Sequence, residues 1–177
     1  MLRSTPPFAV AALLLAGVTG CSSEESRLNE AIAKLDPNQE YLPAEVEALL
    51  SAPHETELLS LNPEWLDDPP DDSFHRFEVL GQTPLTAEES AAFFEALRAG
   101  VATRPDLPPP DCFNPRHGVR ITSGDQSLDI AICFECEQIY SYRGDEQIGS
   151  RETSVLPATR YREAVSEHGL TAAPSAQ

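Results

Sequence analysis

Three β-patterned segments follow one another between residues 117 and 142, and they constrain the fold more than any other feature of the chain. They read HGVRIT, SLDIAICF and EQIYSY, and they are rich in branched and aromatic residues. The first two are separated by SGDQ, in which Gly124 and Asp125 suit a tight turn. With that turn, Ser123 faces Gln126, and a turn shifted by one residue moves every facing pair by one position. We therefore expect an antiparallel hairpin at the centre of a sheet.

The remaining pattern predicts helices around this hairpin. Helical spacing of apolar residues indicates helices at residues 23–35, 43–50, 86–100 and 158–168. Residues 55–61 read as a short strand, with a helical continuation as the alternative, and a second strand begins at residue 74. Prolines and aspartates predict loops at residues 62–73 and 102–111. The expected class is α+β, a small antiparallel sheet with a central hairpin, flanked by helices.

The best-marked helix starts at Thr86, where Glu89 completes a capping box, and Gly100 is the expected C-cap. The length suits a single α+β domain, which we place at residues 28–170. Residues 21–27 are expected to be a tether and residues 171–177 a disordered tail.

The N-terminus has the order of a secretory signal peptide, which we place at residues 1–20. Arg3 precedes the apolar run FAVAALLLAGV, which is too short to span a bilayer. The stretch VTGC, ending at Cys21, resembles the lipobox of bacterial lipoproteins; the alternative is an ordinary signal peptide. The resemblance implies a lipoprotein cleaved before Cys21, which would carry three acyl chains, palmitate among them, and hold the chain stably on the membrane. Ser22 resembles the signal for the outer membrane, so we expect a cell-envelope location, facing the periplasm.

The charge balance limits the class of partner. Removing residues 1–20 takes away only Arg3 of the 12 basic residues, which leaves 11 basic against 29 acidic residues and a formal charge of −18. Nucleic acid and anionic head groups are therefore poor partners. An acidic surface also serves solubility, so the charge alone identifies no cationic ligand.

The cysteines after residue 100 suggest a disulfide. A redox CxxC needs a helix N-terminus to lower the thiolate pKa, whereas the strand pattern continues after Cys136. In a flat strand Cys133 and Cys136 lie roughly 10 Å apart, too far to bond unless the chain turns there. The hairpin places Cys136 opposite Cys112, Phe113 or Asn114, so we expect a disulfide between Cys112 and Cys136. Pro115 is the residue that would bend this strand away.

Two other uses of these cysteines stay open. Cys112, His117, Cys133 and Cys136 form a Cys3His set of the kind zinc prefers, if a kink brings them to one side. Otherwise, alternation of side chains places Cys133 on the same face as His117. There Arg116 and His117 would favour the thiolate of a reduced Cys133, the alternative being an inert buried thiol.

Two segments, CFNPRHGVRI and DIAICFEC, together resemble an uncharacterised family of small bacterial proteins. That family carries a CFxPRHG element followed by an ICFEC element, and the similarity covers about residues 74–170. The resemblance implies no activity, but it implies that one set of residues acts as a unit: Cys112, Pro115, Arg116, His117, Cys133 and Cys136.

No nucleophile elbow, zinc-protease helix or phosphate loop is present, so no catalytic residue is assigned. The sequence favours a non-enzymatic binding or scaffold domain in the cell envelope, stabilised by a disulfide and without a cofactor. The alternatives are a zinc-binding domain and a thiol redox protein. The membrane is the expected partner through the lipid, and no protein or small-molecule partner is identified.

Overall fold

The computed structural model describes residues 21–174, apart from the side chains of Cys21 and Ser22. Six described strands form one antiparallel sheet in the order β2-β1-β3-β4-β5-β6. The strands are β1 (Glu55–Trp65), β2 (Phe77–Leu85), β3 (His117–Ser123), β4 (Gln126–Cys133), β5 (Gln138–Arg143) and β6 (Glu146–Glu152). The β3–β4 hairpin is innermost, so the expected α+β fold with a central hairpin is confirmed.

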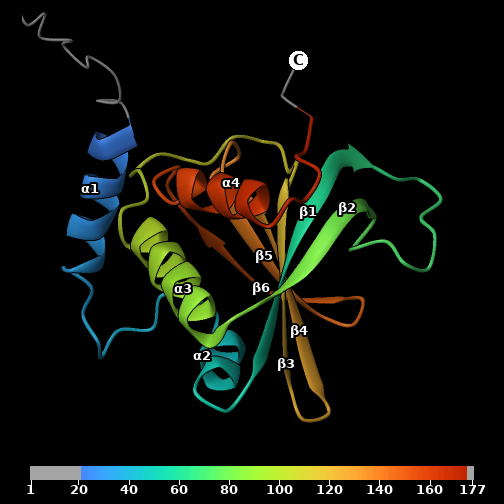
Figure 1. The fold of residues 1–177 in the computed structure, drawn as a ribbon, viewed down its shortest axis with the longest axis horizontal. Helices are drawn as coiled ribbons and strands as arrows, with labels where there is room; N and C mark the ends of the chain where they lie inside the picture. Colours follow the sequence, from blue (N-terminus) through green and yellow to red (C-terminus); the bar gives the residue numbers. More distant parts are fainter. Residues whose placement is uncertain (1–20, 175–177) are drawn as a thin grey trace, which may run out of the picture.

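The helices lie mainly on one side of this sheet. They are α1 (Cys21–Ile32), α2 (Ala44–Leu50), α3 (Ala87–Ala102) and α4 (Ala158–Glu167). α2, α3 and α4 pack their apolar residues on one face of the sheet, and α1 lies on the outer side of α3 (Figure 1). The main core therefore lies between this helix layer and the inward side chains of β1, β3, β4 and β5.

The hairpin register follows from its turn. Ser123 pairs with Gln126, as expected, and Gly124 has a φ of 57°. Glycine suits this left-handed conformation because it has no Cβ to clash with the backbone. The local turn chemistry thus sets the pairing of both central strands.

The same register separates two residues that we expected on one face. His117 pairs with Ile132 and lies on the helix-covered face. Cys133 is the next residue after Ile132, and successive strand side chains point to opposite faces. The expectation that Cys133 and His117 share a face is therefore wrong.

The start of α3 is confirmed and its end is not where we expected it. Thr86 Oγ1 accepts the Glu89 amide at 3.2 Å, and a Glu89 carboxylate oxygen accepts the Thr86 amide at 2.8 Å, which completes the capping box. Gly100, expected as the C-cap, lies inside the helix. A Cβ there would lie 2.4 Å from Thr153 Oγ1 and 2.7 Å from Pro157 Cγ, so this glycine allows close packing.

The other face of the sheet carries a smaller apolar layer. It consists of Leu59, Leu61, Phe74, Phe77 and Ala131, with Val79, Phe113 and Tyr142 packed at its edge. Beside it lies a partly buried polar group: Asp129 accepts hydrogen bonds from His75 Nε2 at 2.9 Å and from Arg120 at 2.8 and 2.9 Å. Burial opposes ionisation of Asp129, but these donors hold the pKa of its carboxyl below the ordinary value.

β1 is longer than expected, since it runs to Trp65 through a segment interpreted as a loop. β3 pairs with β1 only as far as Ser60 opposite His117, so the last part of β1 has β2 as its single neighbour. A proline is tolerated in this part of β1 because its missing backbone N–H is not required for pairing with a neighbouring strand. Pro63 was therefore a misleading loop signal.

Two further differences concern hairpins. β2 starts at Phe77 rather than residue 74, because His75 and Arg76 adopt φ values of 50° and 73° and form a tight turn. β6 was not expected at all, although Gly144 and Asp145 precede it with the same turn dipeptide as the central hairpin.

Both ends of the described chain pack on the domain. Residues 21–27, expected as a tether, belong to α1, where the Glu24 carboxylate accepts a hydrogen bond from Thr159 of α4 at 2.8 Å. The C-terminal segment, residues 171–174, also makes contacts: Ser60 Oγ donates to the Thr171 carbonyl at 2.6 Å. The signal peptide expected at residues 1–20 and the end of the tail lie outside the described residues. No helix within residues 21–174 is long and apolar enough to cross a membrane.

Candidate functional site

The CFEC segment forms a turn between β4 and β5. β4 ends at Cys133, Glu137 adopts a φ of 54°, and β5 starts at Gln138. The turn brings the Cα atoms of Cys133 and Cys136 to 5.2 Å, and the two cysteines form a disulfide. A disulfide is therefore present, but the expected pairing of Cys112 with Cys136 is wrong, because the chain turns where we expected a continuous strand.

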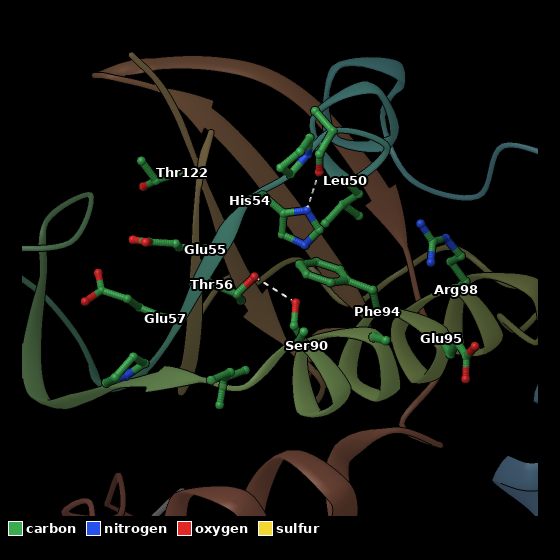
Figure 2. A pocket seen from close by; sticks show the side chains of 16 residues that line it. Leu50, His54, Glu55, Thr56, Glu57, Ser90, Phe94, Glu95, Arg98 and Thr122 are labelled. Carbon is green, nitrogen blue, oxygen red and sulfur yellow. Dashed lines mark hydrogen bonds between the residues drawn. The ribbon is translucent and has the colours of Figure 1, made fainter. Parts of the chain in front are cut away.

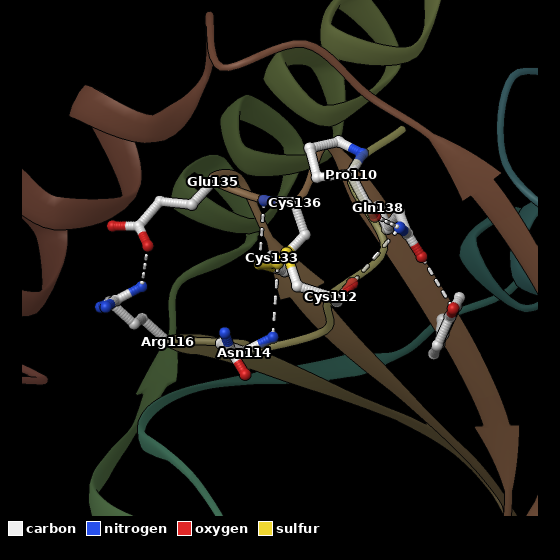
Figure 3. The surroundings of a disulfide bond; sticks show 9 residues. Pro110, Cys112, Asn114, Arg116, Cys133, Glu135, Cys136 and Gln138 are labelled. Atoms are coloured by element: carbon white, nitrogen blue, oxygen red, sulfur yellow. Dashed lines mark hydrogen bonds and ion pairs between the residues drawn. A yellow bond between two sulfur atoms is a disulfide. The ribbon is translucent and has the colours of Figure 1, made fainter. Parts of the chain in front are cut away.

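Cys112 stays outside the ladder as an exposed free thiol. β3 begins only at His117, and the chain before it, which contains Pro115, runs as a loop. Figure 3 shows this loop beside the disulfide, with the Asn114 amide donating to Cys136 Sγ at 3.4 Å and the Gln138 side chain reaching the Cys112 carbonyl at 3.3 Å. The loop contacts the turn through its backbone rather than through a second disulfide.

The Cys3His zinc set is not assembled. Cys133 and Cys136 are joined in the disulfide, Cys112 is exposed, and His117 lies on the other face of the sheet. Among residues 21–174, no group of three or more His, Cys, Asp or Glu side chains is arranged to hold a metal ion. The thiol site is also absent here, because a bonded and buried Cys133 offers no thiolate for a neighbour to activate.

Arg116 and His117, expected beside that thiol, meet elsewhere. Arg116 forms an ion pair with Glu135 of the CFEC turn at 2.7 Å (Figure 3). Its Nε also donates to the Pro174 carbonyl at 3.0 Å. His117 packs under α4, with its ring 5.6 Å from those of Phe134 and Tyr161.

Arg116, His117, Phe134 and Glu135 line a pocket where the pairing of β1 with β3 ends, between α4 and the C-terminal segment, which we call the His117 pocket. Its volume is about 170 Å³. The lining side chains are Ser60, Asn114, Arg116, His117, Phe134, Glu135, Ala158, Arg162, Val165, Ala172 and Ala173. The two segments with CFxPRHG and ICFEC therefore meet in space, at the contact of Asn114 with Cys136 and around this pocket, whose lining contains no cysteine.

His117 is the unusual group in this pocket. It is 7% exposed, yet neither ring nitrogen makes a hydrogen bond to any residue that the structure describes. Buried polar groups are normally paired, so an imidazole left without a partner in a cavity is suited to meet something from outside. Burial, and then the charges of Arg162 and Arg116, lower the pKa of His117 to about 3. The ring is neutral at physiological pH.

A second pocket lies between α2, α3 and the ends of β1 and β2, which we call the α2–α3 pocket (Figure 2). Its volume, about 830 Å³, is larger than that of the His117 pocket, and more polar side chains line it. Its buried hydroxyls satisfy one another, since Thr56 Oγ1 and Ser90 Oγ share a hydrogen bond of 2.8 Å. His54 Nδ1 bonds the Ala52 carbonyl at 2.8 Å. Among the side-chain nitrogen and oxygen atoms that line this pocket, none is both fully buried and without a partner.

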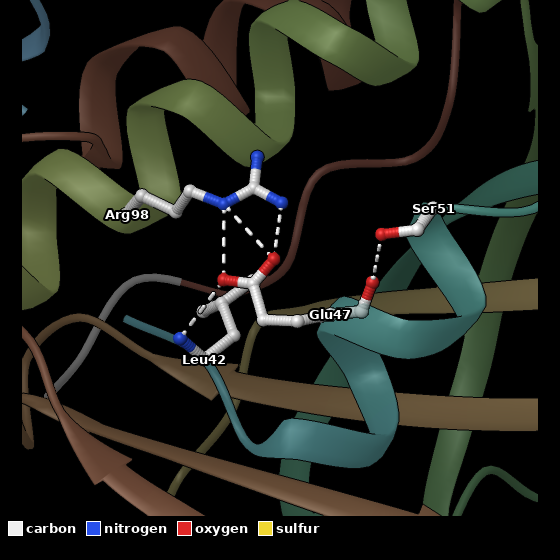
Figure 4. Close-up of polar contacts among 4 residues, drawn as sticks. All are labelled: Leu42, Glu47, Ser51 and Arg98. Carbon is white, nitrogen blue, oxygen red and sulfur yellow. Dashed lines mark hydrogen bonds and ion pairs between the residues drawn. The ribbon is translucent and has the colours of Figure 1, made fainter. Parts of the chain in front are cut away.

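The rim of the α2–α3 pocket is held by an ion pair. The Nε and one terminal nitrogen of Arg98 on α3 donate hydrogen bonds to the carboxylate oxygens of Glu47 on α2 (Figure 4). The Leu42 amide donates to the same carboxylate. Burial opposes ionisation of Glu47, but Arg98 and the amide keep the pKa of the carboxyl below its usual value. Arg98 is therefore occupied by a structural contact.

Sequence reasoning missed Arg162, Glu135, Ser60 and the C-terminal segment as parts of the His117 pocket. Of these, only Glu135 lies in a motif that the sequence marks, the CFEC segment. The others come from distant segments that meet only in the fold. Comparison with known proteins adds no functional assignment: no family model, curated protein or solved structure matches this chain.

Proposed function

We propose that this chain is a lipid-anchored cell-envelope protein whose domain binds a small ligand in the His117 pocket without chemically changing it. The lipobox-like VTGC and the preceding apolar run support the anchor. The observation that carries the binding role is the buried His117 ring, which faces a cavity with neither nitrogen paired among the described residues.

The geometry favours binding over catalysis. Ser60 pairs with His117 across β1 and β3, which places a hydroxyl and an imidazole in one pocket. The hydroxyl proton, however, is donated to the Thr171 carbonyl. A histidine with a pKa near 3 is also a weak general base at neutral pH. The pair lacks both the hydrogen bond and the basicity of an activated nucleophile.

The anchor is tested by replacing the lipidated thiol. Cys21→Ser should abolish labelling with radioactive palmitate and leave the precursor uncleaved at that site, while the wild type fractionates with the outer membrane. Recovery of the wild type as a free periplasmic protein would overturn the anchor.

The pocket is tested with a filling variant. Ala173→Phe places a ring in the cavity from the C-terminal segment and leaves the sheet untouched, whereas Ala173→Ser is the matched control. A fragment screen followed by the NMR signals of the His117 ring should give ligands that bind the wild type and Ala173→Ser but lose at least tenfold affinity with Ala173→Phe. Equal binding to all three proteins, or no ligand of any charge, would overturn the binding role.

A further inference from the structure

We propose that the ligand of the His117 pocket is a small organic acid, whose carboxylate lies between His117 and the guanidinium groups of Arg162 and Arg116. This inference rests on the proposed binding function and names the class of ligand that the pocket takes.

The charge of the pocket is opposite to that of the whole chain. The chain has a formal net charge of −17, yet two of its 12 basic residues, Arg116 and Arg162, line this one small cavity. The single carboxylate in the lining, Glu135, is already paired with Arg116. Arg162 forms no ion pair among the described residues, and its terminal NH2 donates only to Thr159 Oγ1 at 2.9 Å. The cavity therefore has a net positive charge that no residue around it neutralises.

The available donors suit a carboxylate. A guanidinium presents a planar fork that matches two carboxylate oxygens, and His117 adds a ring N–H with no competing acceptor. A doubly charged phosphate would need more donors than one arginine without an ion pair and one imidazole supply. The rest of the lining includes apolar side chains, namely Phe134, Ala158 and Val165. The lining therefore suits a ligand that has an acid group and a short hydrocarbon body.

The volume sets the size of that body. Pockets for drug-sized ligands span about 300–1,000 Å³. The His117 pocket, at about 170 Å³, is smaller than this range. A short-chain monocarboxylate is thus a better match than a long fatty acid, a nucleotide or a peptide.

Binding of an acid would reverse the electrostatics around His117. The charged groups facing its ring are Arg116 beside it on the chain, Glu135 from the β4–β5 turn and Arg162 from α4; the buried Tyr161 is un-ionised because burial raises the pKa of its phenol. Residues 171–174 of the covering segment contribute no ionisable side chain. A bound carboxylate favours the imidazolium form, so the acid should bind together with a proton and more tightly as the pH falls.

The test uses the mature lipidated protein in a non-ionic detergent and a cationic buffer at low chloride. Butyrate, butyramide and butylammonium serve as probes because they share a body and differ in charge. Binding is followed by calorimetry and by the NMR signals of the His117 ring at pH 7.5, 6.5 and 5.5. Butyrate should bind at least tenfold more tightly than either other probe, and its affinity should rise severalfold from pH 7.5 to 5.5.

Two variants that remove the same charge are compared, one inside the pocket and one far from it. Arg162→Gln should weaken butyrate binding at least fivefold, whereas Arg143→Gln, at the exposed end of β5, should stay within twofold of the wild type. Butyramide binding as well as butyrate, or equal losses in both variants, would overturn the acid as ligand while leaving a binding pocket in place. A pH-independent affinity would overturn the proton uptake. No response to any probe, together with failure of the wider fragment screen, would overturn the binding function itself.

Discussion

At the scale of single residues, the imidazole of His117 and the hydroxyl of Ser141 both lack a partner among the described residues, and they differ in what they face. The His117 ring borders a cavity, so water or a ligand can reach its nitrogens. The hydroxyl of Ser141 lies inside the helix-covered core, where its Oγ is fully buried and unpaired. An unpaired polar atom costs free energy in both places, but only the first can be satisfied from outside.

His117 should make the fold acid-sensitive at mildly acidic pH. Its folded-state pKa of about 3 lies below the unfolded value of 6.5, so the unfolded chain binds the proton first as the pH falls. Its contribution to the free energy of unfolding is complete above about pH 6.5 and decreases by up to about 1.4 kcal/mol per pH unit below it. The lowered pKa values of Asp129 and Glu47 act in the same direction, but only below about pH 4.5. Urea unfolding between pH 6.5 and 4.5 should show this slope in the wild type and a flatter one in His117→Gln; parallel slopes would contradict it.

Ser141→Ala should stabilise the protein by about 1 kcal/mol, because it removes a buried hydroxyl that has no described hydrogen-bond partner. The matched control is Ser90→Ala, where the hydroxyl shares a bond of 2.8 Å with Thr56. That change should destabilise by about 1–2 kcal/mol, since it leaves the buried Thr56 hydroxyl unpaired. Both free energies come from denaturant unfolding. A loss of stability in Ser141→Ala would mean that the hydroxyl has a partner after all.

At the scale of elements, the outcome depended on how local each signal was. The β3–β4 register could be predicted because Gly124 determines the turn within two residues. The capping box fixed the start of α3 in the same way. A disulfide was predicted, but its pairing could not be, because whether Cys133 and Cys136 meet depends on a left-handed residue, Glu137, that nothing in the strand pattern marks. The His117 pocket could not be predicted for a related reason, since its lining residues come from segments far apart in the chain.

The β4–β5 turn predicts which thiol reacts. Cys112 is exposed, whereas Cys133 and Cys136 are buried and bonded to each other. Iodoacetamide should therefore label Cys112 in the folded protein, and label the other two only after reduction and unfolding. Peptide mapping checks this. A non-reduced peptide linking Cys112 to Cys136 would restore the pairing expected from the strand pattern and contradict the turn described here.

At the scale of the whole molecule, the helix next to the proposed anchor is part of the domain. α1 packs Leu28 and Ala31 against Ala96 and Ala99 of α3. With a lipid on Cys21, the first residue of α1, the domain would have little freedom relative to the membrane surface. The sequence suggested a tether at residues 21–27 that is separate from the domain, because helical periodicity does not tell where a helix docks.

Arg160 of α4 ties these parts together. It pairs with Glu25 and donates to Asn29 Oδ1 at 3.2 Å on α1, and it also reaches the Ala92 carbonyl of α3 at 3.4 Å. Its loss should loosen α1 more than the sheet, because α1 contacts the rest of the domain through one apolar stripe and through polar contacts in which Arg160 takes a large part.

Arg160→Gln should therefore speed amide hydrogen exchange in α1 by about tenfold, which corresponds to about 1.4 kcal/mol, while exchange in β3 and β4 changes little. Mass spectrometry of the exchanged peptides measures both regions in one experiment. Arg143→Gln, which removes the same charge from the exposed end of β5, controls for net charge and should leave α1 unchanged. Equal acceleration across α1 and the central hairpin would show that Arg160 supports the whole fold rather than the docking of the anchored helix.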